Sequence, residues 1–181
     1  MLYLVLLASL PVLLEAHVHD FDQNLLTTVY KPPDYEGYCE GAPTIYSYHI
    51  HVLFWQNNKP RTASALELRE QFIKRFELEG KDCEIFPGDP APGHEMCVFE
   101  VNLEPAGPFT TAQYAFYIPP GDLLETSAWM LQHRGVQDVF IHPNTGCETN
   151  DHTKWYTFSG DKWPIDASIF SCDRPGCKPK S

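Results

Sequence analysis

Three histidines in this sequence have the type and spacing to bind a metal ion. His49 and His51 lie two residues apart in the β-rich segment 46–55, and His142 ends a second such segment at 137–142. Imidazoles two residues apart on a strand share one face, with Cα atoms ~6.6 Å apart, so both can reach one ion at ligand distances of ~2.1 Å. The ordinary alternative is that a histidine in a strand is a structural residue that only forms hydrogen bonds. A third imidazole on the same face favours the metal site.

The neighbours Asp151 and His152 could carry acid–base chemistry, because a carboxylate beside a histidine shifts the pKa of the imidazole or orients its ring. The alternative is that Asp151 caps a turn and His152 is solvated. Arg134 closes a predicted helix, where a positive charge complements the helix C-terminus. Its guanidinium could instead bind a substrate carboxylate through two parallel hydrogen bonds.

A small set of predicted elements must position these candidates. Helical or alternating spacing of apolar residues, bounded by glycine and proline, indicates where they lie. In chain order they are a strand at 46–55, a helix from Thr62 or Ser64 to Gly80, strands at 96–103 and 112–118, a helix at 122–134, and a strand at 137–142 that Pro143 ends. This βαββαβ order predicts an α+β, ferredoxin-like fold, an antiparallel sheet with two helices on one face.

Side chains alternate along a strand, which divides the residues of the predicted sheet between two faces. The apolar set that fits beneath the helices is Ile50, Val52, Phe54, Val139 and Ile141, and the set left on the open face is His49, His51, Leu53, Trp55, Phe140 and His142. The open face would expose a large apolar patch, so we expect a second copy of the chain to cover it in a homodimer. The rival cover is the segment before residue 45 or the tail beyond residue 160.

The N-terminal residues 1–16 form an apolar run that is too short to remain in a membrane as a spanning helix. Such a run is typical of a secretory signal peptide, and a buried N-terminal helix or strand is the alternative. No second run of this kind follows, so we expect no membrane anchor. We divide the chain into the signal peptide, an extended segment at 17–44, a domain at 45–160 and a cysteine-containing tail at 161–181. The expected location is extracellular.

Six cysteines follow the predicted cleavage point, an even number that indicates up to three disulfides in an oxidising compartment. Closeness in the chain favours Cys83 with Cys97 and Cys172 with Cys177, which leaves Cys39 with Cys147. A thiolate zinc site is the rival interpretation. It is disfavoured because no pair of cysteines has the C-x-x-C spacing.

The 181 residues carry a formal net charge of −11, and no basic run or stripe interrupts the acidic balance. We therefore expect no nucleic acid partner, because binding to phosphates needs clustered lysine and arginine. Hydrophobic residues make up 43% of the chain, which is enough for a buried core and indicates one globular domain rather than disorder.

Five short motifs occur in an order that resembles one known family. They are Tyr48-His49-Ile50-His51-Val52, Leu68-Arg69-Glu70, His133-Arg134-Gly135, Ile141-His142-Pro143-Asn144-Thr145-Gly146 and Asp151-His152-Thr153. Together they resemble the DOPA 4,5-dioxygenase family over residues 46–160. The resemblance implies a ferredoxin-like fold and extradiol ring opening of a catechol such as DOPA with O2 and non-haem iron(II), which must offer open coordination positions. Another divalent ion such as zinc is the alternative metal.

The resemblance also implies roles for the candidate residues. On this interpretation His49, His51 and His142 bind the metal ion. His152 acts as acid and base with help from Asp151, and Arg134 binds the carboxylate of the substrate.

The chain departs from the family inside one motif, where it reads Gly107-Pro108-Phe109-Thr110 and members usually read G-P-H-P. The phenyl ring of Phe109 removes an imidazole that could act as a ligand or as an acid and base. The loop that holds Cys83 and Cys97 also looks like an insertion. An alternative function is therefore a secreted, non-catalytic protein that binds a metal ion or a small aromatic ligand on the same scaffold.

Overall fold

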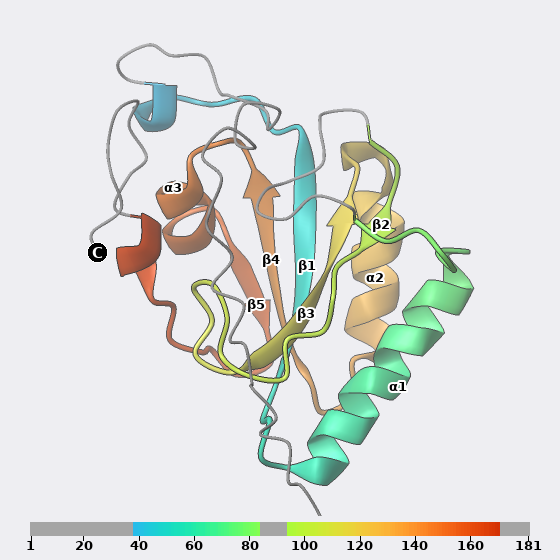
Figure 1. The fold of residues 1–181 in the computed structure, drawn as a ribbon. Coiled ribbons are helices and arrows are strands. Elements are labelled where there is room, and N and C mark those ends of the chain that lie inside the picture. Colours follow the sequence, from blue (N-terminus) through green and yellow to red (C-terminus); the bar gives the residue numbers. More distant parts are fainter. Residues whose placement is uncertain (1–37, 84–93, 171–181) are drawn as a thin grey trace, which may run out of the picture.

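The computed structural model describes residues 38–83 and 94–170, which form a five-stranded antiparallel sheet with helices on both sides (Figure 1). The strands are β1 (Ser47–Phe54), β2 (Cys97–Val98), β3 (Ala112–Ile118), β4 (Asp138–Asn144) and β5 (Thr157–Ser159), in the sheet order β2-β3-β1-β4-β5. The helices are α1 (Lys59–Arg75), α2 (Leu123–His133) and α3 (Glu148–Thr153), with 3-10 turns η2 (Tyr38–Glu40), η3 (Pro120–Asp122) and η4 (Ala167–Phe170). The first four strands with α1 and α2 confirm the predicted ferredoxin-like α+β fold, to which α3 and β5 are additions.

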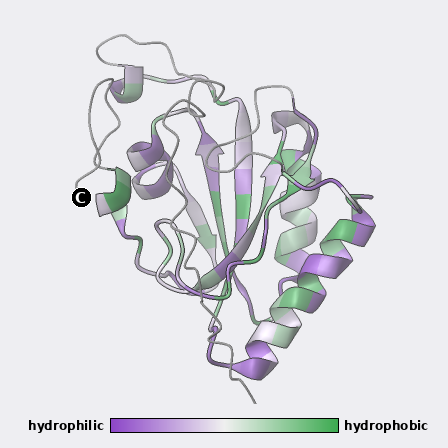
Figure 2. Ribbon diagram, in the orientation of Figure 1, coloured by the Kyte–Doolittle hydropathy of each residue, from purple (hydrophilic) through white to green (hydrophobic). Residues whose placement is uncertain are grey.

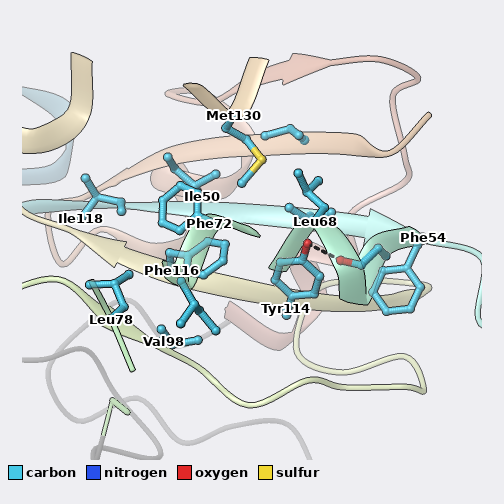
Figure 3. Packing of buried hydrophobic residues seen from close by; sticks show 14 of the residues in the cluster. Ile50, Phe54, Leu68, Phe72, Leu78, Val98, Tyr114, Phe116, Ile118 and Met130 are labelled. Atoms are coloured by element: carbon cyan, nitrogen blue, oxygen red, sulfur yellow. Dashed lines mark hydrogen bonds between the residues drawn. The ribbon is translucent and has the colours of Figure 1, made fainter. Parts of the chain in front are cut away.

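One face of the sheet is covered by α1 and α2, and strand alternation correctly predicts its side chains. Figure 2 shows hydrophobic and hydrophilic residues alternating along α1, as expected for a helix with one face in a core. The close-packed cluster beneath the helices is drawn in Figure 3. Its buried members include Ile50, Val52, Phe54, Leu68, Phe72, Met130 and Val139.

The start of α1 differs from the prediction. The helix begins at Lys59 because the side chain of Asn58 accepts a hydrogen bond from the backbone N–H of Arg61 at 3.2 Å. Neither Thr62 nor Ser64 caps it, and it ends before the predicted glycine stop. Asparagine and proline close together are typical of a breaker, but both residues also favour the start of a helix.

The predicted strand at 96–103 is shortened to the two residues of β2. The chain stops pairing regularly with β3 and returns to it at one residue, Asn102, which forms an isolated bridge with Gln113. Two backbone hydrogen bonds of 2.8 and 2.9 Å join these two residues. The segment between β2 and β3 is therefore anchored beside β3 close to the face that carries the histidines.

The last predicted strand is longer than expected, because β4 continues through Pro143 to Asn144. β5 pairs with β4 only as far as Ile141. At Pro143 the strand therefore has β1 as its one neighbour in the sheet, and a residue without a backbone N–H is tolerated at such an edge.

The face opposite α1 and α2 is covered by the chain itself. Figure 1 places α3 on this side, next to β4 and β5. Leu53 and Phe140 are buried there against Phe109 and against Tyr156, Phe158, Trp163 and Ile165 from the C-terminal part of the chain. Leu53 and Phe140 are therefore not exposed as expected, although Trp55 is 57% exposed. The tail beyond residue 160 supplies part of the cover, as in the rival expectation. A homodimer remains a prediction that no longer rests on this patch.

Two of the three predicted disulfides are confirmed, Cys39 with Cys147 and Cys83 with Cys97. The pair Cys172 and Cys177 lies outside the described residues, as do the signal peptide at 1–16 and most of the segment at 17–44. Within residues 38–83 and 94–170, none of the helices has the length and apolar content needed to cross a membrane.

Candidate metal centre

Neighbouring strands bring His49, His51 and His142 together on the face opposite α1 and α2. His49 and His142 are direct cross-strand partners of β1 and β4, and His51 lies two residues along β1 on the same face. Each ring offers a nitrogen, and the three nitrogens lie within 4.8 Å of one another. All three side chains are buried, and His142 is only 1% exposed. The structure thus assembles the three histidines that the sequence analysis selected.

Hydrogen bonds determine which nitrogen carries the proton in two of these rings. Nδ1 of His51 lies 3.0 Å from Oε1 of Gln113, and Nδ1 of His142 lies 2.9 Å from the carbonyl oxygen of Pro143. Both partner atoms are acceptors, so each imidazole donates from Nδ1 and keeps a lone pair on Nε2. The two Nε2 atoms lie 3.2 Å apart.

This arrangement of two lone pairs fits a shared cation. Two nitrogens that are each ~2.1 Å from one ion at a tetrahedral angle lie ~3.4 Å apart, which is close to the observed separation of the His51 and His142 Nε2 atoms. Without a cation the two lone pairs repel each other. Imidazole nitrogens are suitable donors for zinc, iron, copper or nickel, so the residues fit a divalent transition metal ion.

The electrostatic environment keeps these imidazoles in the form that binds metals. Burial lowers the pKa of His51 and of His142 well below the usual 6.5, and neighbouring histidines lower both values further. Both rings are therefore neutral at pH 7. A neutral imidazole can bind an ion without first losing a proton.

Aromatic rings surround the histidines. The Phe109 ring centroid lies 4.4 Å from that of His51, 5.6 Å from Phe140 and 6.3 Å from His152. Phe99 lies 5.0 Å from His49 on another side. The residue at which the chain departs from the family motif is therefore part of the site, where it forms an apolar wall.

His152 joins the group from α3. Its ring centroid lies 4.0 Å from that of His142, and its Nδ1 lies 2.9 Å from the carbonyl oxygen of Glu148, to which it donates. The residue is only 6% exposed, so the alternative of a solvated side chain is wrong. His152 thus belongs to the same buried group of imidazoles as His142.

Asp151 holds the turn that leads from β4 into α3. Its carboxylate accepts hydrogen bonds from the backbone N–H of Thr145 at 3.0 Å and from the Thr145 hydroxyl at 2.8 Å. The turn-capping alternative is therefore realised. The disulfide between Cys39 and Cys147 fastens the same turn to η2, so α3 is held firmly beside the sheet.

Arg134 is not brought to the histidines. Its guanidinium donates to the carbonyl oxygen of Gln137 at 2.7 Å and lies beside Asp138 at the start of β4. Asp138 and His142 are four residues apart on that strand, a separation of ~13 Å. The helix-ending role considered for Arg134 agrees with this position.

The sequence analysis missed Gln113, which touches His51, and Asn102, which touches Gln113. The side-chain amide of Gln113 donates from Nε2 to Oδ1 of Asn102 at 2.6 Å. One signal was present, since Gln113 is a polar residue inside the otherwise apolar strand β3. Strand pairing places it opposite Leu53, on the same face as the histidines.

Comparisons with known proteins agree with this description. The model of the Dopa 4,5-dioxygenase family matches residues 48–169. A DOPA 4,5-dioxygenase of Amanita muscaria is 28% identical over 122 residues, covering 67% of this chain and 48% of that protein. An uncharacterized 21.2 kDa protein of Botryotinia fuckeliana is 30% identical over 131 residues, covering 68% and 62%. The chain thus matches about half to three fifths of the length of these relatives.

A solved structure supports the fold. The crystal structure of a Nostoc punctiforme protein, provisionally named a dioxygenase, superposes with a TM-score of 0.54 at 18% identity. The superposition covers 76% of this chain and 97% of the other. At this identity the likeness shows a common fold.

Proposed function

Because this chain belongs to the Dopa 4,5-dioxygenase family, we propose that it is an extradiol dioxygenase that opens the ring of DOPA or a related catechol. The observation that carries the proposal is the pair of Nε2 lone pairs of His51 and His142, which face each other at 3.2 Å beside His49. A buried donor set of this kind is suited to a cation. The family chemistry requires one.

We assign His49, His51 and His142 as the residues that hold the ion, with iron(II) as the proposed metal and zinc as the alternative. A bound iron(II) ion supplies the redox chemistry that allows O2 to react with a catechol. In the overall reaction one ring carbon–carbon bond beside the diol breaks and both oxygen atoms enter the product. The reaction therefore needs no external reductant.

The remaining residues of the site have supporting roles in this proposal. His152 exchanges a proton with the catechol through Nε2, since its Nδ1 donates to the Glu148 carbonyl. Asp151 acts indirectly, by holding the turn that positions α3. Phe109 and Phe140 keep water away from the reacting atoms, because both are buried apolar rings beside the histidines.

A second function is favoured by one observation, the phenyl ring of Phe109 against His51. If the reaction requires an imidazole at that position, the chain is a non-catalytic protein that binds a metal ion or a small aromatic ligand in the same place. Stacking on the aromatic rings of the site would retain such a ligand.

Anaerobic loading with iron(II), followed by DOPA in air, separates the two functions. We expect a coloured ring-opened product from the wild type and none from His51→Ala. His133→Ala is the matched control, because His133 is exposed at the end of α2, where it stacks on Trp129. Stoichiometric metal and catechol binding without product would support the non-catalytic function instead.

We also propose that the protein is extracellular. The two disulfides support this location, since such bonds persist in oxidising compartments. Mass spectrometry of protein secreted by its host tests the proposal. The expected mass is that of a chain without residues 1–16 and with oxidised cysteines, and retention of those residues would contradict it.

A further inference from the structure

The amide of Gln113 lies between His51 and a second amide, that of Asn102. Oε1 of Gln113 lies 3.0 Å from Nδ1 of His51, while Nε2 of Gln113 lies 2.6 Å from Oδ1 of Asn102. The backbones of Asn102 and Gln113 are also joined by two hydrogen bonds. The three side chains therefore form a chain of hydrogen bonds that ends at a proposed metal ligand.

The orientation of the Gln113 amide decides the tautomer of His51. An amide offers an acceptor on oxygen and donors on nitrogen. In the structure Asn102 presents Oδ1, an acceptor, to the Gln113 nitrogen, and the Gln113 oxygen therefore faces His51. An acceptor opposite Nδ1 places the proton of His51 there, and the lone pair then lies on Nε2.

The reversed amide would have the opposite effect. It would present an N–H to Nδ1 of His51 and so move the proton to Nε2. That nitrogen lies 3.2 Å from Nε2 of His142, so His51 would then donate a hydrogen bond to His142. The same pair of histidines can therefore either hold an ion or form a hydrogen bond, according to how one amide is turned.

We propose that Asn102 and Gln113 are positioning residues that keep Nε2 of His51 unprotonated and so hold the site ready for a metal ion. This inference rests on the proposed function for the identity of the metal ligands. Asn102 does so without contact to the ion, through the single acceptor that it offers to Gln113. Mutation of the hydrogen-bond partners of ligating histidines typically lowers metal affinity by ~10–100-fold.

The test compares Asn102→Leu, which removes the acceptor, with Asn102→Asp, which retains it. Both variants keep the backbone bridge to Gln113. Zinc(II) titration against a competing chelator should show ~10–100-fold weaker binding for Asn102→Leu and at least wild-type affinity for Asn102→Asp. Nitrogen NMR of histidine-labelled, metal-free protein should show the His51 proton on Nδ1 in the wild type and in Asn102→Asp, and on Nε2 in Asn102→Leu.

If Asn102→Leu does not fold, Gln113→Met and Gln113→Glu provide the same contrast, since only the second offers His51 an acceptor. Equal zinc affinity and an unchanged His51 tautomer in the leucine or methionine variant would overturn the inference and leave the proposed metal site intact. If the wild type binds no zinc, while the His51 tautomer still differs between the wild type and the leucine or methionine variant, the proposed metal site would instead be overturned. The two failures are therefore distinguishable.

Discussion

The two faces of the sheet are made by alternate residues of the same strands, yet they differ in kind. Ile50 and Val52 lie beneath α1 and α2 in a cluster of apolar side chains. His49 and His51, their neighbours in β1, lie on the other face among polar nitrogens and aromatic rings. Both faces are buried. The helix-side face contributes to the stability of the fold. The histidine face instead buries imidazole nitrogens away from water, where a metal ion can bind them.

The largest expected effect on the histidine face comes from His142→Ala. We expect the bound zinc(II) to fall from one ion per chain to almost none, because the variant loses one of three nitrogen donors and the partner of His51 Nε2. Metal analysis after dialysis measures the loss, with His133→Ala as control. Full stoichiometry in His142→Ala together with loss of the ion in His152→Ala would move the ligand role to His152.

The matching change on the helix-side face is Phe72→Ala. The Phe72 ring is fully buried and stacks on Phe116 at 4.0 Å, so its truncation should lower the free energy of unfolding by ~3–5 kcal/mol. The folded fraction should still bind one zinc ion. Leu124→Ala, at a side chain that is 82% exposed, should change the stability by less than ~0.5 kcal/mol. A specific loss of metal from folded Phe72→Ala would show that the two faces are not independent.

A smaller effect distinguishes ligands from acid–base groups within the histidine face. His152→Ala should retain the metal ion but lower catechol turnover by ~100-fold or more, as expected for loss of a general acid–base residue. Turnover and metal content are measured on the same sample. Unchanged turnover at full metal content would exclude His152 from the reaction.

The smallest expected effect is the pH dependence of stability in the metal-free protein. His51 and His142 have a pKa well below 6.5 when folded, chiefly through burial, while their pKa in the unfolded chain is about 6.5. Below pH 6.5 the unfolded state therefore binds more protons, and the free energy of unfolding should fall from pH 7.5 to pH 5.5. Urea unfolding measures this slope, and His142→Ala should make it shallower. A stability that rises on acidification would be inconsistent with buried neutral histidines.

The division between the two faces could be predicted because a strand has a strict period of two. Once β1 was recognised, the positions of His49, Ile50 and His51 followed, and the same held for Val139 and His142 in β4. Disulfide pairing by closeness in the chain was also sound for Cys83 and Cys97. Local patterns are enough for such features.

Other features depend on contacts between distant segments, and no local pattern encodes them. Trp163 and Ile165 cover the histidine face from a segment without regular periodicity, so we expected a second copy of the chain there. Arg134 was assigned to the site from its guanidinium chemistry and from the resemblance, but it bonds to Gln137 at the other end of β4 from His142. Gln113 reaches His51 from a strand 62 residues further along the chain.

We propose above that the histidine face holds one divalent metal ion. X-ray absorption spectroscopy of the zinc(II)-loaded wild type tests it most directly, because it reports the ligands of the ion itself. We expect one ion per chain with three imidazole nitrogens at about 2.0–2.1 Å in the wild type, and two or fewer such nitrogens in His51→Ala. A folded protein that binds no ion, or an ion without imidazole ligands, would contradict it.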